Sequence, residues 1–217
     1  MVGLTIIYET TAIKSPQCVL EREPLPKIVD RDDRREEVCG AAMRILARGG
    51  SSALTLRSLA EELNGSITLV THFFSNRADL FEAITDDLLS SWDASVDWKT
   101  SDDPVVNLRQ LVSWLVPETP EEVQREASRV ALISARNQAP SIDNFYIAME
   151  AKSRSILTEA VVPLVPERSV SSAVDALRAS VNGLVLSVVE HPKHWTNERR
   201  EKYVEFILAG FNHMYRH

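Results

Sequence analysis

Apolar residues recur at helical spacing along most of the chain, and prolines and glycines separate the helices that this spacing predicts. The 217 residues show no strand-like alternation and no internal repeat. We therefore predict an all-α fold. Its helices are expected at residues 30–48, 55–63, 77–98, 104–116, 120–138, 140–162, 169–190 and 196–215, with a further short helix that begins near residue 66.

Residues 55–80 hold the strongest local pattern, two short helices joined by a tight turn ahead of a longer helix. Thr55 can cap the first helix and Ser66 the second, because a side-chain oxygen there accepts a free backbone N–H. Between them, Asn64 and Gly65 tolerate the left-handed backbone of a turn. Ala60 supplies the small side chain that is needed where two steeply crossing helices touch. This pattern is typical of a helix-turn-helix.

The second short helix is expected to expose short, mostly uncharged side chains that can reach base edges in a DNA major groove. Nearby arginines and hydroxyl groups can hold phosphates on either side. The predicted DNA-binding residues are Thr55, Arg57, Ser66, Ile67, Thr68, Thr71, His72 and Arg77. The alternative is an ordinary helical hairpin with no role in DNA binding.

This segment resembles the DNA-binding unit of TetR-family transcriptional regulators, and the resemblance extends from Thr55 to Leu80 without a gap. The matching residues are Thr55, Arg57, Leu59, Ala60, Glu61, Ser66, His72, Phe74, Asp79 and Leu80. The family usually has Gly-Val, Gly, a phosphate-binding Tyr and Lys where this chain has Asn64-Gly65, Thr68, Thr71 and Arg77. These departures imply one phosphate contact fewer at Thr71 and a missing core side chain at Gly65.

The helices after residue 103 resemble, more loosely, the BetI-type C-terminal domain of the same family. We expect a flexible arm at residues 1–29, a three-helix DNA-binding domain at 30–80 and a helical ligand-binding and dimerisation domain at 81–217. Small residues in helix 169–190 could form a four-helix interface across a two-fold axis with Phe206, Ile207, Phe211 and Met214. Packing of these residues within one subunit is the alternative.

The formal net charge of −7 argues against a protein that coats nucleic acid without sequence preference. The seven arginines of residues 31–80 balance seven acids, whereas residues 81–217 are acidic, and this asymmetry favours a small, specific DNA footprint. Cys18 and Cys39 form no disulfide framework. We also expect no apolar run of the length needed to span a membrane. We therefore expect a soluble, cytoplasmic protein without a membrane partner.

Catalytic and metal-binding patterns are weak. His213 and His217 have the spacing of a metal pair but lack a third ligand, and no glycine-rich phosphate loop or nucleophile elbow occurs. We expect no enzymatic activity, no metal and no cofactor. The candidate effector-binding residues are Trp114, Arg136, Asn137, Tyr146, Asn182 and Trp195. The shortage of basic residues on apolar helix faces favours a neutral or cationic, largely apolar ligand.

Together these patterns predict a homodimeric transcription regulator, most simply a repressor, that binds double-stranded operator DNA and responds to an unidentified small-molecule effector. The alternative from another class is a helical small-molecule-binding protein or enzyme in which the hairpin is only structural.

Overall fold

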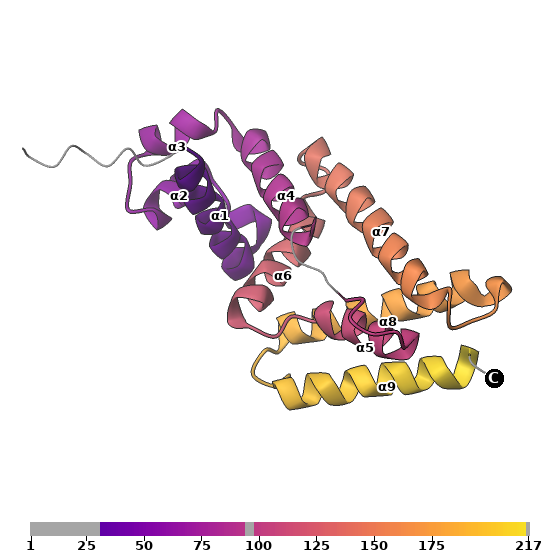
Figure 1. Ribbon diagram of the computed structural model, residues 1–217. Helices are drawn as coiled ribbons and strands as arrows, with labels where there is room; N and C mark the ends of the chain where they lie inside the picture. The colour runs from indigo at the N-terminus through magenta and orange to yellow at the C-terminus, as the bar shows by residue number, and fades with distance from the viewer. Residues whose placement is uncertain (1–30, 94–97, 216–217) are drawn as a thin grey trace, which may run out of the picture. The chain divides into compact units, whose positions relative to one another are not determined.

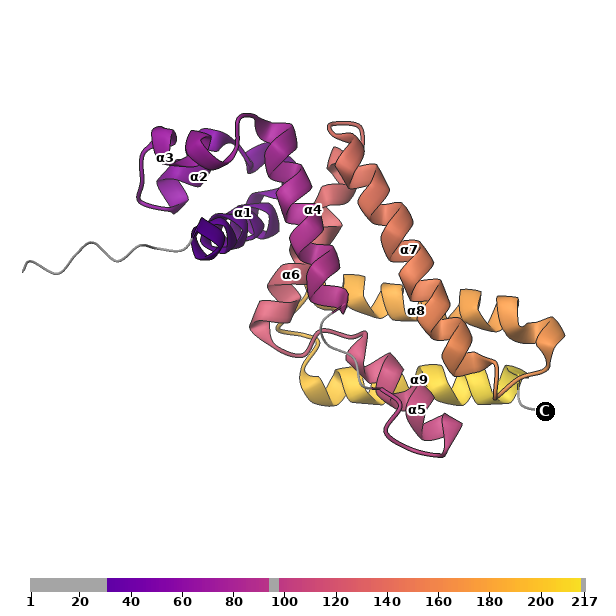
Figure 2. The same ribbon diagram turned by 45° about the horizontal axis from the view of Figure 1, so that its top comes forward.

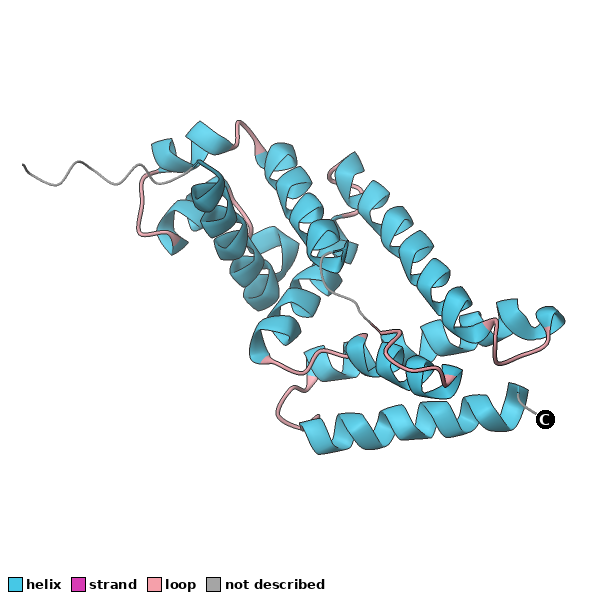
Figure 3. Cartoon of the chain, viewed as in Figure 1, coloured by secondary structure: helices cyan, strands magenta, loops and turns pink. Residues whose placement is uncertain are grey.

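The computed structural model describes residues 31–93 and 98–215, and the arm expected at residues 1–29 lies outside these ranges (Figure 1). Throughout the described ranges the regular elements are helices and none is a strand, which confirms the predicted fold class (Figure 3). The α-helices are α1 (Arg31–Ala53), α2 (Leu56–Glu62), α3 (Ile67–Phe73), α4 (Arg77–Asp93), α5 (Pro104–Trp114), α6 (Pro120–Leu132), α7 (Pro140–Val161), α8 (Val170–Glu190) and α9 (Asn197–Tyr215).

Local sequence signals set most of the helix boundaries. Asp103 caps α5 by accepting the backbone N–H of Val105 at 2.8 Å. Thr119 caps α6, and the carboxylate of Glu122 reaches back to the Thr119 N–H at 3.0 Å, which completes a capping box. α1 is interrupted at Gly50, where φ is 69° and ψ is −175°. The glycine pair at 49–50 therefore ends the regular part of α1, as predicted.

Two predicted helix ends are wrong. α6 ends at Leu132 instead of near residue 138, and the chain then forms a short 3-10 turn at Ile133–Ala135. Ala139 is already extended, with φ −153° and ψ 136°, because the ring of Pro140 disfavours helical backbone in the residue before it. The helix expected to reach Trp98 is described only as far as Asp93, and Trp98 itself is not helical.

Two clusters of buried side chains hold the helices together. The first joins α1–α4 to α6 and the beginning of α7, and it contains Leu59, Ile84 and Phe145. The second joins α5, α8 and α9 to the end of α7, and it contains Leu111 and Leu157. α7 runs from the side of α4 to α8 in both views (Figures 1 and 2), so it contributes to both clusters. The helices nearest α3 thus share one core with helices of the C-terminal half.

α8 and the turn before it form a long apolar stretch. Residues Glu167–Glu190 contain an 18-residue window of mean hydropathy 1.3, enough by length and composition for a membrane span. The expectation that no stretch reaches this length and hydropathy is therefore wrong. Val174, Leu177 and Val185 of α8 are buried in the second cluster, and α8 packs against α7 and α9. Packing between helices accounts for the apolar character of these three residues.

Candidate nucleic-acid interface and adjoining cavity

The first helix of the hairpin, α2, begins with a fully formed cap. Thr55 Oγ1 accepts the backbone N–H of Ser58 at 3.0 Å, and Ser58 Oγ accepts the backbone N–H of Thr55 at 2.9 Å. Ser58 also donates to the carbonyl oxygen of Ala53 at 2.7 Å, which fastens α2 to the end of α1. Three local hydrogen bonds therefore fix the direction in which α2 leaves α1.

The turn between α2 and α3 depends on Asn64. Its φ of 50° lies in the left-handed region, which asparagine tolerates better than most residues, and the backbone N–H of Gly65 donates to the Ala60 carbonyl oxygen at 2.9 Å. Ser66 then caps α3 by accepting the N–H of Leu69 at 3.3 Å. Gly65 itself is exposed, so the expectation that it removes a core side chain is wrong.

α3 presents one buried and one exposed face. Val70 is fully buried and anchors the helix, whereas Ile67, Thr68, Thr71 and His72 are exposed. Ile67 is 52% exposed, as much as Ile133 on the opposite half of the chain, so its apolar side chain is open to solvent. The four residues predicted to face DNA therefore form one continuous surface on a short helix, and it contains no Asp, Glu, Lys or Arg.

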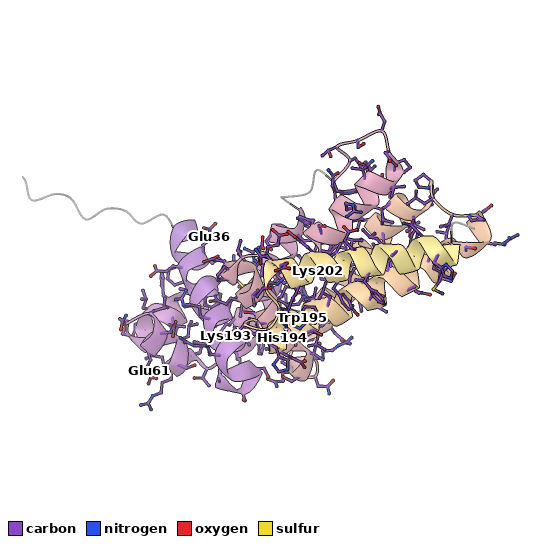
Figure 4. The ribbon with its side chains drawn as sticks, turned by 90° about the horizontal axis from the view of Figure 1, so that it is seen from below. Glu36, Glu61, Lys193, His194, Trp195 and Lys202 are labelled. Carbon is purple, nitrogen blue, oxygen red and sulfur yellow. The ribbon has the colours of Figure 1, made fainter. Side chains whose placement is uncertain are left out.

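The two arginines predicted to hold phosphates have different surroundings. Arg57 on α2 is 85% exposed and pairs only across one helical turn, with Glu61 at 3.1 Å. Figure 4 shows Glu61 at the outer surface of the helix-turn-helix. Arg77 at the start of α4 is partly buried: it donates to the carbonyl oxygen of Ser51, and its guanidinium lies 5.0 Å from the centre of the Phe81 ring. Arg77 thus holds the start of α4 to the end of α1.

Two arginines of α1 also form ion pairs, and both bind the same carboxylate. Arg44 donates to Glu62 Oε1 at 2.8 Å, and Arg48 donates to the other oxygen of the same carboxylate. The hydrogen bonds from Arg44 and Arg48 hold the pKa of Glu62 below its usual value. This cluster braces α1 against α2.

A cavity of about 210 Å³ lies below the hairpin, among α4, α5, α6 and α7. Trp92 of α4 and Trp114 of α5 meet edge to face in its wall, with ring centres 5.0 Å apart. Phe145 and Met149 of α7 complete the apolar side. Pro117 also lines the cavity, and Arg200 of α9 donates to its carbonyl oxygen at 2.6 Å. This hydrogen bond ties that part of the lining to α9.

α6 supplies the charged wall of the cavity, with Glu122, Arg125, Glu126 and Arg129. Arg129 Nε donates to Glu126 at 2.7 Å, and both side chains are largely buried. Partial burial opposes ionisation of Glu122, but hydrogen bonds from the backbone N–H groups of Thr119 and Glu118 keep its pKa below the usual value. The sequence suggested a shortage of basic residues on apolar helix faces, but Arg125 and Arg129 both line this wall.

Of the six candidate effector residues, Trp114 lines the cavity and Asn182 lines a narrow recess that adjoins it. Tyr146 points elsewhere: its hydroxyl donates to the carbonyl oxygen of Arg129, and burial raises its pKa to about 12. Arg136 pairs with Asp143 at 2.6 Å on the surface, beside the exposed Asn137.

The sixth candidate, Trp195, lies in the turn between α8 and α9 (Figure 4), with its ring centre 5.6 Å from that of Tyr203. The cavity residues that were not predicted from the sequence are Trp92, Phe145, Met149 and the charged residues of α6. Helical spacing does place Glu122, Glu126 and Arg129 on one side of α6, but no sequence signal tells which neighbouring helices close a cavity over that side.

Metal chemistry finds no support in the described ranges, where no group of three His, Cys, Asp or Glu side chains could hold an ion. His217, the second member of the expected pair, lies outside those ranges. Cys39 is buried in the first cluster, and burial raises the pKa of its thiol to about 11. The thiol is therefore protonated at neutral pH and weakly reactive.

The capped hairpin exposes one face of its second helix, and it shares a core with a helical body that contains a cavity. This arrangement is that of a helix-turn-helix DNA-binding protein. Comparison with known proteins identifies its kind. Residues 39–84, from α1 to the first half of α4, match the family described as bacterial regulatory proteins, tetR family. Together with the relatives below, this match supports a TetR-family transcriptional regulator, that is, a DNA-binding regulator of transcription.

Relatives and solved structures extend the likeness beyond the hairpin. The HTH-type transcriptional regulator BetI of Burkholderia thailandensis is 26% identical over 165 residues, which are 75% of this chain and 85% of that protein. A transcriptional regulator from Rhodococcus sp. Rha1 superimposes with a TM-score of 0.71 at 20% identity, over 84% of this chain and 98% of that one. A regulator from Saccharomonospora viridis, solved in complex with choline, gives a TM-score of 0.71 at 16% identity, over 82% and 97% of the two chains.

Proposed function

We propose that this chain is a cytoplasmic, homodimeric repressor that reads operator DNA with α3 and is released when a small molecule binds the cavity. The observation that carries the proposal is the exposed face of α3. Apolar and hydroxyl side chains there have no covering partner among the described residues, while the same helix is anchored by Val70. Two such helices, one in each subunit, would read half-sites about 34 to 36 Å apart or a multiple of that spacing.

The proposed base-reading residues are Ile67, Thr68, Thr71 and His72. In this proposal Arg57 and the hydroxyl groups of Thr55 and Ser66 bind phosphates, which set the orientation of α3 without reading sequence. Replacing Thr68 or His72 with Ala should alter the base preferred at one position of each half-site. Binding-site selection with each variant measures this change, and an unaltered consensus from both variants would rule out the base-reading role.

Ligand control is supported by the helices that the cavity and the hairpin share. α4 carries Trp92 in the cavity wall at one end and Arg77 beside Ser51 at the other. α6 carries Arg129 in the same wall, and the neighbouring Ser128 donates to the carbonyl oxygen of Met43 in α1 at 2.8 Å. A ligand that tilts either helix would change the spacing of the two α3 helices. A coupling of about 1–3 kcal/mol would weaken operator binding about 5- to 150-fold.

Dimerisation is proposed through α8 and α9, which pack side by side. Ala179 and Gly183 of α8 are exposed, as are Phe206 and Met214 of α9, and a Cβ added at Gly183 would meet nothing within 4 Å. Such a face permits close approach by a second copy.

Ile207 and Phe211 were predicted from the sequence to lie at the interface, but neither is exposed. Both are buried within the subunit, in the second cluster, so they support the exposed face from beneath.

We further propose a domain boundary near residue 80. Residues 30–80 would bind DNA, and residues 81–217 would bind the ligand and the second subunit. α4 would serve both parts. The choline complex of the Saccharomonospora viridis protein supports a small organic molecule as the effector of this chain too. None of the relatives named above is described as an enzyme, which argues against the alternative of a catalytic body.

The decisive experiment is fluorescence anisotropy of the purified full-length protein on labelled DNA from upstream of its own gene, with unrelated DNA as competitor at near-physiological salt. We expect retained binding, with two subunits per site. Loss of all binding at modest salt would refute the regulator and favour a helical small-molecule-binding protein or enzyme in which the hairpin is only structural.

A further inference from the structure

A recess of about 30 Å³ lies beside the cavity, between α6, α7 and α8. The cavity and the recess adjoin, because they share the lining residues Trp92, Leu115, Glu126, Arg129 and Met149. A volume of this size has room for a single small polar group, since one water needs about 10–15 Å³. Arg178 and Asn182 of α8 line its far side.

Arg178 is a buried cation with spare hydrogen-bonding capacity. Its side chain is 18% exposed, and its Nε is buried without a hydrogen-bond partner among the described residues. Its Nη2 lies 3.3 Å from Glu150, a carboxylate that Arg154 already binds at 2.7 Å. Because a buried donor without an acceptor is costly, the Nε–H of Arg178 favours an incoming oxygen atom.

The side chains that line the recess carry one more positive than negative charge. Arg129 and Arg178 are positive, and Glu126 is negative and bound to Arg129 at 2.7 Å. Glu150, which pairs with Arg178 from outside the lining, is shared with Arg154. Burial lowers the pKa of the Arg178 guanidinium; Glu150 opposes that change, and the like charge of Arg129 adds to it. A negative group bound in the recess beside Arg178 would oppose both effects.

The main cavity has an apolar side in addition to the charged wall that α6 supplies. Trp92, Trp114, Phe145 and Met149 line it, and its volume of about 210 Å³ exceeds the roughly 150 Å³ of a cavity that holds benzene. A phenyl ring or a short alkyl chain therefore fits there, with its polar end directed to the recess.

We infer that the effector of this chain is an amphipathic organic carboxylate. Its oxygen atoms accept hydrogen bonds from Arg178 and Asn182 in the recess, and its apolar body packs against Trp92 and Trp114 in the main cavity. The inference rests on the proposed ligand control of DNA binding and specifies the chemical class of the ligand. It replaces the neutral or cationic ligand expected from the sequence, and it differs from the choline bound by the Saccharomonospora viridis protein.

The test compares three probes with the same phenylpropyl body and different ends: 3-phenylpropionate, its amide 3-phenylpropanamide and the cation 3-phenylpropylammonium. Isothermal titration into the wild-type protein should give the tightest binding for the carboxylate. We expect it to bind at least about tenfold more tightly than the amide, equivalent to about 1.4 kcal/mol. Equal binding of carboxylate and amide, or tighter binding of the cation, overturns the inference.

Arg178→Gln removes the charge and the Nε–H, and it should bring the carboxylate-to-amide ratio to within about twofold of unity. Arg168→Gln is the matched control, because Arg168 is exposed in the turn Glu167–Ser169 and lines neither cavity nor recess. An unchanged ratio in Arg178→Gln overturns the role of Arg178. If that variant does not fold, the three probes on the wild-type protein decide the ligand class by themselves.

Anisotropy on upstream DNA in the presence of each probe separates this inference from the proposed function. Release of DNA by the carboxylate supports both, whereas release by the cation alone retains ligand control and overturns the carboxylate. If DNA binding is retained and none of the probes binds, the carboxylate inference fails while the DNA-binding regulator stands. Absence of DNA binding, with the carboxylate still bound tightly, refutes the proposed function but not the recognition of the anion.

Discussion

Arg57 and Arg77 carry the same charge on the same hairpin, yet their surroundings predict opposite consequences when each is replaced by Ala. Arg57 is exposed, and its one ion pair, with Glu61, contributes little to stability at the surface. If it binds phosphate, a dimer loses two contacts in Arg57→Ala. The slope of log K against log salt should then fall in magnitude by about 1.8, since each contact contributes about 0.9.

Arg77→Ala should act mainly on folding. The lost hydrogen bond from a charged donor to the Ser51 carbonyl is worth about 1.5–3 kcal/mol, and the guanidinium over Phe81 adds about 0.5–2 kcal/mol. The Nε of Arg77 is buried without a hydrogen-bond partner among the described residues, so its removal gives back part of that loss. We expect a net loss of about 1–3 kcal/mol, or roughly 2–4 °C in melting temperature for each kcal/mol.

Two measurements on each variant separate these effects. Urea unfolding gives the free energy of unfolding, and anisotropy from 50 to 200 mM salt gives the slope, over the range in which counterion release is strong. Arg168→Ala, an exposed change on the body, is the control for general loss of charge. An unchanged slope in Arg57→Ala, or wild-type stability combined with a reduced slope in Arg77→Ala, would refute the assignment drawn from the two environments.

Three further predictions concern the cores and the surface. Leu59→Ala, at a fully buried position, should reduce the free energy of unfolding by about 2–5 kcal/mol in urea; a loss below 1 kcal/mol would show that the site collapses around the smaller side chain. Phe206→Glu, at a position 68% exposed, should turn dimers into monomers in sedimentation experiments while urea stability of the subunit changes little; a persistent dimer would exclude this face. Asp87→Asn should stabilise the protein at pH 7, because burial raises the pKa of Asp87 although Arg125 opposes the rise; the gain should vanish as the pH falls through that raised pKa, and a gain that grows instead would contradict it.

The elements that depend on neighbours in sequence could be predicted. Thr55, Ser66, Asn76 and Thr119 each accept a backbone N–H within three residues, so residue type and position alone specify the cap. The exposed face of α3 follows from the same kind of information, because Val70 fixes which side of a short helix is inward.

The features that sequence reasoning missed depend on contacts between distant segments. Nothing near Arg77 in the sequence reveals the Ser51 carbonyl, 26 residues away, to which it donates. Likewise, helical spacing puts Phe206 and Ile207 side by side as apolar residues, but only the packing of α9 on its neighbours buries one and exposes the other. The cavity is the clearest case, since its walls come from four helices.

The connection between cavity and hairpin rests on two adjacent residues of α6 that face different partners. Arg129 lines the cavity, whereas Ser128 is fully buried and donates to the backbone of α1 at Met43. Close-packed interiors transmit a displacement of one side chain to those that it contacts. A ligand that displaces Arg129 would therefore shift α1 with α6, and α1 carries α2 through the bond from Ser58 to Ala53. On this reasoning the effector acts on DNA binding by turning the whole hairpin as one body, without any rearrangement inside it.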